Sequence, residues 1–142
     1  EEKIIDNLQD FMLELGRGFT FVGRQQRFTY EEDHFMVDLV FYNRLLRCFV
    51  LLDLKIGKLA HQDIGQMQMY VHYYDRCVKL EEENPTIGIL LCQDKNDAVV
   101  EMTLPEGNEQ IFASRYKTVL PSKEELQKLL SEANEVQGHM TF

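Results

Sequence analysis

Residues 37–58 constrain the fold most, because their sequence VDLVFYNRLLRCFVLLDLKIGK predicts two apolar strands joined by a polar turn. Three charged side chains interrupt these strands, namely Asp38, Asp53 and Lys55. A charge is costly to bury unless it is paired or binds a metal ion. Side chains two apart on a strand share a face, and the turn brings Asp38 close to Asp53, so we expect all three to meet. Such a group indicates a site for a divalent cation and a phosphate; a structural ion pair at the sheet rim is the alternative.

Hydrophobic periodicity predicts the remaining elements of the chain. We expect a helix at 3–15, strands at 19–30, 35–42 and 48–55, a polar turn at 31–34, a long helix at 59–83, a strand at 86–92, a short helix running into a strand within 95–103, a strand at 110–117, a helix at 122–134 and a tail at 135–142. The core face of the long helix is expected to hold Ile64, Met67, Val71, Tyr74 and Val78.

This order of elements predicts an α/β fold. Three consecutive strands with short turns form an antiparallel meander, and a strand that follows a long helix pairs in parallel. The expected result is a mixed central sheet flanked by helices. A length of 142 residues fits one domain, 1–142. Because the chain begins with Glu1 rather than Met, we expect a piece of a longer protein.

Composition narrows the functional classes. There is no apolar run of 18 or more residues, so no membrane span is expected. Cysteines are few and widely separated, as in a protein of the reducing cytoplasm. The net charge of −9 disfavours a simple nucleic-acid binder. Residues 14–58, however, hold seven Lys or Arg and six Asp or Glu, so the positive charge is concentrated around the predicted site.

Further polar residues are candidates for the same site. Gln66 and Tyr70 are four apart on the long helix and suit contacts to substrate or water; a half-buried helix flank is the alternative. Glu14 closes the first helix and is a candidate third metal ligand, or simply a solvated helix end. Three cations are candidates for phosphate contacts, or for ordinary exposed strand positions: Arg24, Arg27 and Lys58.

With these residues in place, the chain resembles the PD-(D/E)XK nuclease superfamily. That superfamily has a restriction-endonuclease-like α-β-β-β-α-β core, with Asp on the second strand and (D/E)-x-K on the third. Asp38 and Asp53-Leu54-Lys55 match these positions. Gln66 and Tyr70 are similar to a Q-x-x-x-Y element that some branches carry on the following helix. Glu14 stands where several members place an acidic residue.

A closer resemblance covers about residues 4–120. The segments ELGRGFTFVGRQ, VDLVFYNRLLRCFVLLDLKIGK and PTIGILLC look like the C-terminal domain of bacterial YhcG-like proteins. In that group another region, often thought to bind DNA, precedes this domain. Two positions differ: Val37 rather than Pro precedes Asp38, and Asp53 stands where the closer group usually has Glu.

The resemblance implies a metal-dependent nuclease domain that acts on DNA. Mg²⁺ or Mn²⁺ would be held by Asp38 and Asp53, with help from Glu14, and Lys55 would position water or stabilise charge. The rival hypothesis is a catalytically silent module that binds nucleic acid or a protein partner. A homodimer held by the acidic C-terminal half is a third alternative.

Overall fold

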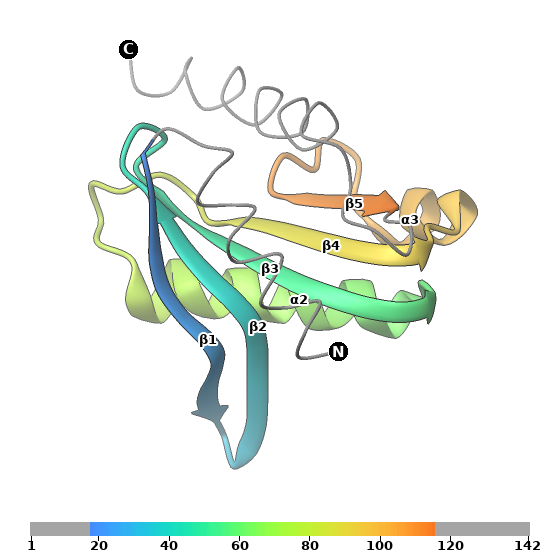
Figure 1. The fold of residues 1–142 in the computed structure, drawn as a ribbon, viewed down its shortest axis with the longest axis horizontal. Coiled ribbons are helices and arrows are strands. Elements are labelled where there is room, and N and C mark those ends of the chain that lie inside the picture. Colours follow the sequence, from blue (N-terminus) through green and yellow to red (C-terminus); the bar gives the residue numbers. More distant parts are fainter. Residues whose placement is uncertain (1–17, 116–142) are drawn as a thin grey trace.

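The computed structural model describes residues 18–115. These residues form a five-stranded sheet in the order β1-β2-β3-β4-β5 with helices along it (Figure 1). The strands are β1 (Phe19–Tyr30), β2 (Asp33–Asn43), β3 (Cys48–Lys58), β4 (Ile87–Asp94) and β5 (Ile111–Arg115). The helices are α2 (His61–Tyr73), the π-helical turn η1 (Tyr74–Val78) and α3 (Asp97–Thr103). The predicted helices at 3–15 and 122–134, the tail and Glu14 lie outside the described residues.

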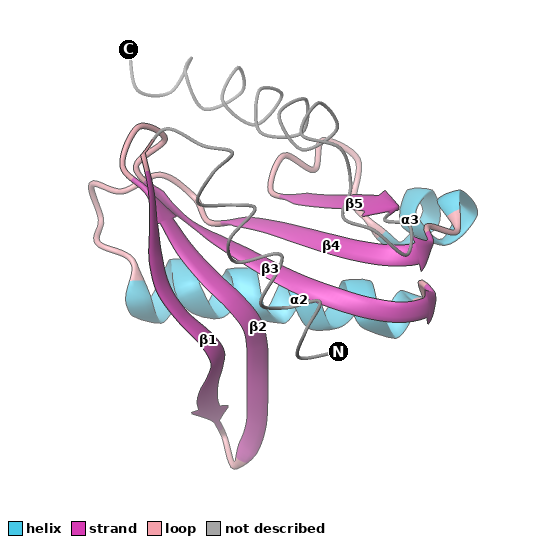
Figure 2. Ribbon diagram, in the orientation of Figure 1, coloured by secondary structure: helices cyan, strands magenta, loops and turns pink. Residues whose placement is uncertain are grey.

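The sheet is mixed, as predicted. Strands β1, β2 and β3 form an antiparallel meander, whereas β4 pairs with β3 and β5 pairs with β4 in parallel. Helix α2 makes the crossover between β3 and β4 and crosses one face of the sheet (Figure 2). The predicted α/β class with a mixed central sheet is therefore confirmed.

Two turns set the register of the meander. Glu31 and Glu32 both have positive φ, as in tight two-residue hairpin turns, so β2 begins at Asp33 and not at residue 35 as predicted. At the other turn, the buried Asn43 side chain accepts hydrogen bonds from the backbone N–H groups of Leu45 and Leu46, at 2.9 and 3.0 Å. This turn fixes Leu39 opposite Leu52 at the far end of the same pair of strands.

Helix α2 packs its apolar side against the sheet through Ile64, Met67 and Val71, as predicted. Gly88 on β4 allows this close approach, because a Cβ there would lie 2.7 Å from the Met67 sulfur. The prediction that Val78 belongs to the core face is wrong, since its side chain is 40% exposed. The cause is the π-helical turn: Lys79 N–H donates to the Tyr74 carbonyl at 2.8 Å, and the wider turn shifts the helical register before Val78.

In the centre of the sheet both faces are buried. Residues 87–92 of β4 are all buried, as expected for a strand that is covered on both sides. One apolar cluster lies between the sheet and α2, and a second one gathers Leu39, Phe41, Val50, Leu52 and Ile89. Residues 97–103, ambiguous in sequence, form the short helix α3. Within residues 18–115, no helix is long and apolar enough to cross a membrane.

Candidate functional site

The strands β2 and β3 end their regular pairing at Leu39 and Leu52, and the next residues in that register are Asp38 and Asp53. There the side chains replace the ladder hydrogen bonds. The Asp38 backbone N–H donates to Asp53 Oδ1 at 2.9 Å, and the Leu54 N–H donates to Asp38 Oδ2 at 2.8 Å. Each carboxylate is therefore tied to the main chain of the opposite strand, and the two acidic groups are held side by side.

Asp53 lies in an environment that disfavours its negative charge. Burial raises its pKa to about 8, and the nearby charges of Asp38 and Asp63 also raise it, while the hydrogen bond from the Asp38 N–H lowers it. A bound cation would favour the ionised form and offset the repulsion between the two carboxylates. The pair thus has the electrostatic character of a cation site.

A cavity of about 350 Å³ opens beside this pair. It is lined by five of the residues predicted from sequence: Asp38, Asp53, Lys55, Gln66 and Tyr70. Their chemical roles remain predictions, but the chain brings them together from β2, β3 and α2. His34 and Asp63, which the sequence did not single out, also line this cavity.

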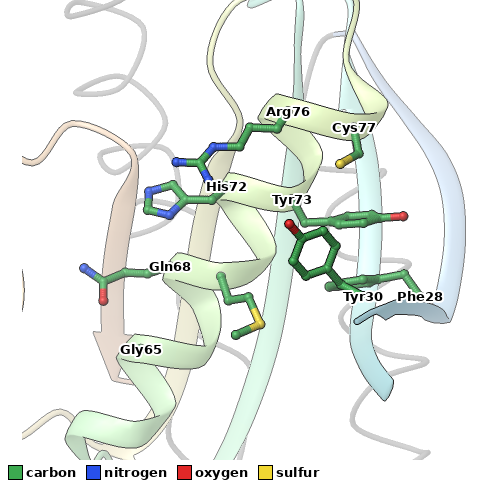
Figure 3. Close-up of a pocket in the computed structure, with 9 residues that line it drawn as sticks. Phe28, Tyr30, Gly65, Gln68, His72, Tyr73, Arg76 and Cys77 are labelled. Carbon is green, nitrogen blue, oxygen red and sulfur yellow. The ribbon is translucent and has the colours of Figure 1, made fainter. Parts of the chain in front are cut away.

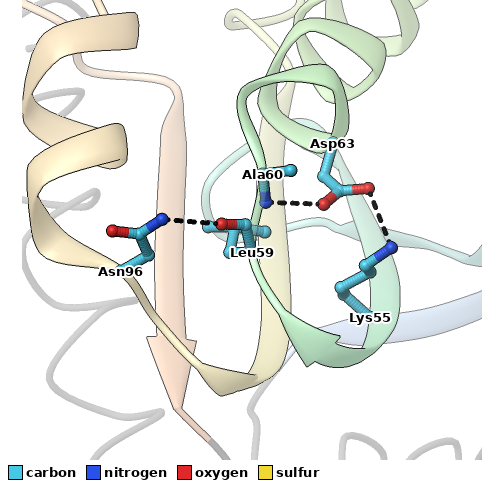
Figure 4. A network of polar contacts seen from close by, with 5 residues as sticks. All are labelled: Lys55, Leu59, Ala60, Asp63 and Asn96. Atoms are coloured by element: carbon cyan, nitrogen blue, oxygen red, sulfur yellow. Dashed lines mark hydrogen bonds and ion pairs between the residues drawn. The ribbon is translucent and has the colours of Figure 1, made fainter.

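Lys55 lies at the side of the cavity in contact with Asp63. Its Nζ is 3.6 Å from Asp63 Oδ1, and 40% of the Lys55 side chain is exposed (Figure 4). The other Asp63 oxygen accepts a 2.8 Å hydrogen bond from the Ala60 N–H, which anchors this carboxylate to the start of α2. Asn96 in turn donates to the Leu59 carbonyl at 3.1 Å. Asp63 therefore restrains the ammonium group of Lys55 beside the two carboxylates.

Tyr70 is more deeply placed than the sequence indicated. Even the alternative of a half-buried helix flank understates its burial, because only 2% of the residue is exposed and its ring contacts Phe28 and Phe35 at centroid distances of 5.7 and 6.3 Å. Burial raises the pKa of Tyr70 to about 12, and the charge of Asp53 adds to this effect. Its hydroxyl is therefore protonated near neutral pH and can donate a hydrogen bond. Gln66, by contrast, is exposed at the cavity wall.

Three predicted cations do not line this cavity. Arg24 and Arg27 lie on β1, opposite Leu39 and Met36, and Arg27 is exposed. Lys58 follows an irregularity in the pairing of β3 with β4, where Gly57 has a φ of +99°. Glu14 lies outside the described residues.

Two carboxylates are suited to a hard divalent cation. Among residues 18–115, no three His, Cys, Asp or Glu side chains cluster closely enough to hold a metal by themselves. Mg²⁺, however, commonly takes only one or two carboxylates from a protein and completes its octahedral shell with water and phosphate oxygens. The Asp38–Asp53 pair fits that mode in its oxygen chemistry, its access to a cavity and the raised pKa of Asp53.

Asp63 and His34 were not predicted as cavity residues, and the sequence holds a partial signal for Asp63 only. Asp63 is an acidic residue in the first turn of a helix, a common helix-start signal, but its contact with Lys55 depends on the path of the segment before α2. His34 lies within hydrogen-bonding distance of Thr29, with Nδ1 2.9 Å from Oγ1 across the β1–β2 hairpin. No spacing in the sequence links it to the carboxylates.

Two comparisons of the sequence with known proteins cover most of the chain. Residues 1–131 match the family model described as the YhcG PDDEXK nuclease domain. The chain is 44% identical over 126 residues, or 89% of its length, to the Escherichia coli (strain K12) protein described as "Putative nuclease YhcG". It spans 34% of that relative's length, about one third.

Solved structures with the same fold are more distant in sequence. A repair endonuclease from Pyrococcus abyssi superposes with a TM-score of 0.58 at 18% identity, covering 82% of this chain and 47% of that one. A complex of EndoMS with double-stranded DNA superposes with a TM-score of 0.57 at 15% identity, covering 86% and 46%. These likenesses concern the fold.

Proposed function

Because the chain belongs to the YhcG PDDEXK nuclease domain family, we propose that its cavity hydrolyses phosphodiester bonds in DNA with a bound Mg²⁺ or Mn²⁺. The observation that carries this proposal is the reciprocal pair of hydrogen bonds that holds Asp38 and Asp53 side by side. Lys55 lines the same cavity. The similarity in fold to an EndoMS–DNA complex supports DNA as the polymer.

Asp38 and Asp53 would hold the ion, and Glu14 remains a proposed further ligand. When bound, such an ion polarises the phosphoryl group and lowers the pKa of a water ligand. The two carboxylates supply hard oxygen donors from adjacent strands, which leaves other positions around the ion open to water and phosphate. Both carboxylates line the cavity that would admit a phosphate.

Lys55 would orient the attacking water or stabilise the charge that develops on the phosphate. Its ammonium is partly exposed, so it can reach a ligand in the cavity while Asp63 restrains it. Asp63 is thus a positioning residue. Gln66 would contact a phosphate or water through its exposed amide, and the protonated Tyr70 hydroxyl would donate a hydrogen bond in the same cavity.

Arg24, Arg27 and Lys58 are proposed to contact DNA phosphates away from the cleavage point. They do not line the cavity, and phosphate contacts of this kind position a nucleic acid without reading its sequence. Their contribution would appear as a loss of affinity when the salt concentration is raised.

Cleavage of plasmid and branched DNA by the purified chain, with Mg²⁺ or Mn²⁺, tests the proposal. We expect Asp53→Asn and Lys55→Ala to lose at least about a hundredfold in rate, since each removes a group from the reacting centre. Asp97→Asn and Lys95→Ala are matched controls, because these residues form an exposed ion pair outside the cavity. Cleavage that is unchanged in the Asp53 and Lys55 variants would refute the proposed site.

A catalytically silent module on the same fold is the second candidate. It is favoured by the net charge of −9 and by the presence of only two carboxylates from the described strands at the site. Calorimetry separates the candidates: the nuclease should bind Mn²⁺ with heat that disappears in Asp38→Ala. A silent module should show no such heat.

A further inference from the structure

A second cavity, of about 470 Å³, lies along the outer side of α2 and the end of β1. Three aromatic residues, Phe28, Tyr30 and Tyr73, form one wall (Figure 3). The side chains of His72 and Arg76 lie on the other side of the helix in this view. We call this cavity the aromatic groove. The nuclease proposal above does not use it.

The aromatic wall is a preformed stack of rings. Phe28 and Tyr73 are stacked with their centroids 4.0 Å apart at an interplanar angle of 15°, and Phe28 also stacks on Phe35, at 5.2 Å and 28°. Tyr30 beside this stack is 54% exposed. Rigid aromatic faces that are open to solvent bind flat ligands well, and bases stack on them in proteins that bind single strands.

The charge of the groove is opposite to that of the chain. Among residues 18–115, those that line the groove include the cation Arg76 and no Asp or Glu, although the chain carries a net charge of −9. Arg76 is exposed and lies next to His72 in Figure 3. A flat ligand with a negative charge is therefore favoured, and a second copy of this acidic chain is disfavoured.

Gly65 keeps the groove open. It lies within α2, where glycine weakens a helix relative to alanine. Packing does not demand it, because no other atom of the described residues, beyond its two chain neighbours and the adjoining backbone of α2, lies within 4 Å of the position that its Cβ would occupy. A larger side chain at Gly65 would instead project into the groove that this residue lines.

The aromatic groove adjoins the cavity beside Asp38 and Asp53, which we call the catalytic cavity after its proposed function. Both lie along α2. Gln66 and Tyr70 line the catalytic cavity, whereas Gly65 and Tyr73 line the groove. Phe28 belongs to the groove and contacts the ring of Tyr70 at 5.7 Å.

We propose that the aromatic groove binds an unpaired nucleobase of the nucleic-acid substrate, stacked on Tyr30 and Tyr73, with the adjoining phosphate on Arg76. This inference rests on the proposed nuclease function for the presence of a nucleic acid. A base inside a duplex has both faces covered by its neighbours, so only an unpaired or extruded nucleotide can enter. The substrate class is therefore DNA that has an unpaired or extruded nucleotide close to the cleaved bond.

Methyl NMR on metal-free protein labelled at its methionines tests this proposal without any cleavage. Met69 lines the groove, while Met102, 84% exposed on α3, serves as an internal control. The probes are a ten-residue oligothymidylate and an abasic oligomer of the same length. We expect oligothymidylate to shift the Met69 signal and not that of Met102, and the abasic oligomer to leave both unchanged.

Variants localise the binding. Tyr30→Ala should weaken oligothymidylate about fivefold or more, the lower end for loss of one stacked base. Gly65→Leu should abolish the Met69 shift in a chain that remains folded by circular dichroism. Arg76→Gln should reduce the slope of log affinity against log salt concentration by about one unit. Arg44→Gln should leave this slope unchanged, because Arg44 is exposed at the β2–β3 turn.

Equal shifts with the abasic oligomer, or affinity that is unchanged in Tyr30→Ala, would overturn the inference. A Met69 signal that moves with protein concentration alone would also overturn it, in favour of self-association. The two proposals fail separately. A native chain that does not cleave DNA but shows the Met69 response refutes the nuclease, and a native chain that cleaves DNA without the Met69 response refutes the aromatic groove.

Discussion

Replacing Asp53 by Asn should make the metal-free protein more stable at alkaline pH, although it removes a proposed metal ligand. The fold raises the pKa of Asp53 from 3.8 to about 8, chiefly by burial and then by the charge of Asp38. Between these two values the folded chain holds a proton that the unfolded chain has released. The free energy of unfolding therefore falls as the pH rises through this window and levels off above it.

For one titrating group, the free energy of unfolding changes by at most about 1.4 kcal/mol per pH unit. Because Asp53 is partly exposed, screening reduces the total, and we expect a loss of roughly 2–3 kcal/mol between pH 5 and pH 9. Asn has the same shape without the charge, and its Oδ1 can still accept the hydrogen bond from the Asp38 N–H. For a chain of this length, the variant should melt on the order of 5–10 °C above the native protein at pH 9.

Thermal and urea denaturation in the presence of a chelator, from pH 5 to pH 9, measure this difference. The two proteins should converge near pH 5 and diverge above it. Mn²⁺ should stabilise the native chain and leave Asp53→Asn unaffected. Asp97→Asn is the control, because Asp97 is exposed and outside the cavity. An Asp53→Asn variant that is less stable than the native chain at pH 9, or that keeps the same pH slope, would refute this account of the pair.

Other consequences can be measured on the same protein. Mn²⁺ affinity should rise about tenfold per pH unit below the Asp53 pKa of about 8 and level off above it, because binding displaces a proton. Calorimetry in buffers of different ionisation enthalpy measures this proton release, and an affinity that does not change with pH would contradict the prediction. Asp63→Asn should lower kcat about tenfold and change KM little, because Lys55 loses its restraint, while Mn²⁺ affinity stays within a few fold; an unchanged kcat would refute the positioning role. Gly88→Ala should destabilise the fold by about 1–3 kcal/mol in urea denaturation, because its methyl group meets the Met67 sulfur; an equal or higher stability would show that α2 can move away.

Local patterns predicted the meander well. The β-branched and aromatic residues within 19–30 and the apolar runs around the Asn43 turn are properties of the sequence itself, and the structure has strands at these places. The early start of β2 was not predicted, because Glu31 and Glu32 adopt positive φ without the Asn or Gly that normally marks such a turn. The exposure of Val78 was missed because a period of 3.6 residues cannot reveal a π-helical turn.

Local patterns in the sequence also predicted part of the grouping of residues around the cavity. Asp38, Asp53 and Lys55 follow from strand alternation and one turn, and they do line one cavity. The burial of Tyr70 depends on Phe28 and Phe35, which reach it from the β1–β2 hairpin, and no angular count on a single helix contains that contact. The placement of Asp63 likewise depends on the path of the segment between β3 and α2, which no local pattern reveals.

The reciprocal bonds between Asp38, Asp53 and the opposite main chain have a consequence for how an ion would enter. Because folding already fixes the distance between the acidic groups, capture of a cation requires exchange of a proton and some water rather than movement of β2 against β3. The reorganisation energy is therefore small, and the amide hydrogens of Asp38 and Leu54, which bond to carboxylates instead of carbonyls, become direct reporters of whether the centre is loaded.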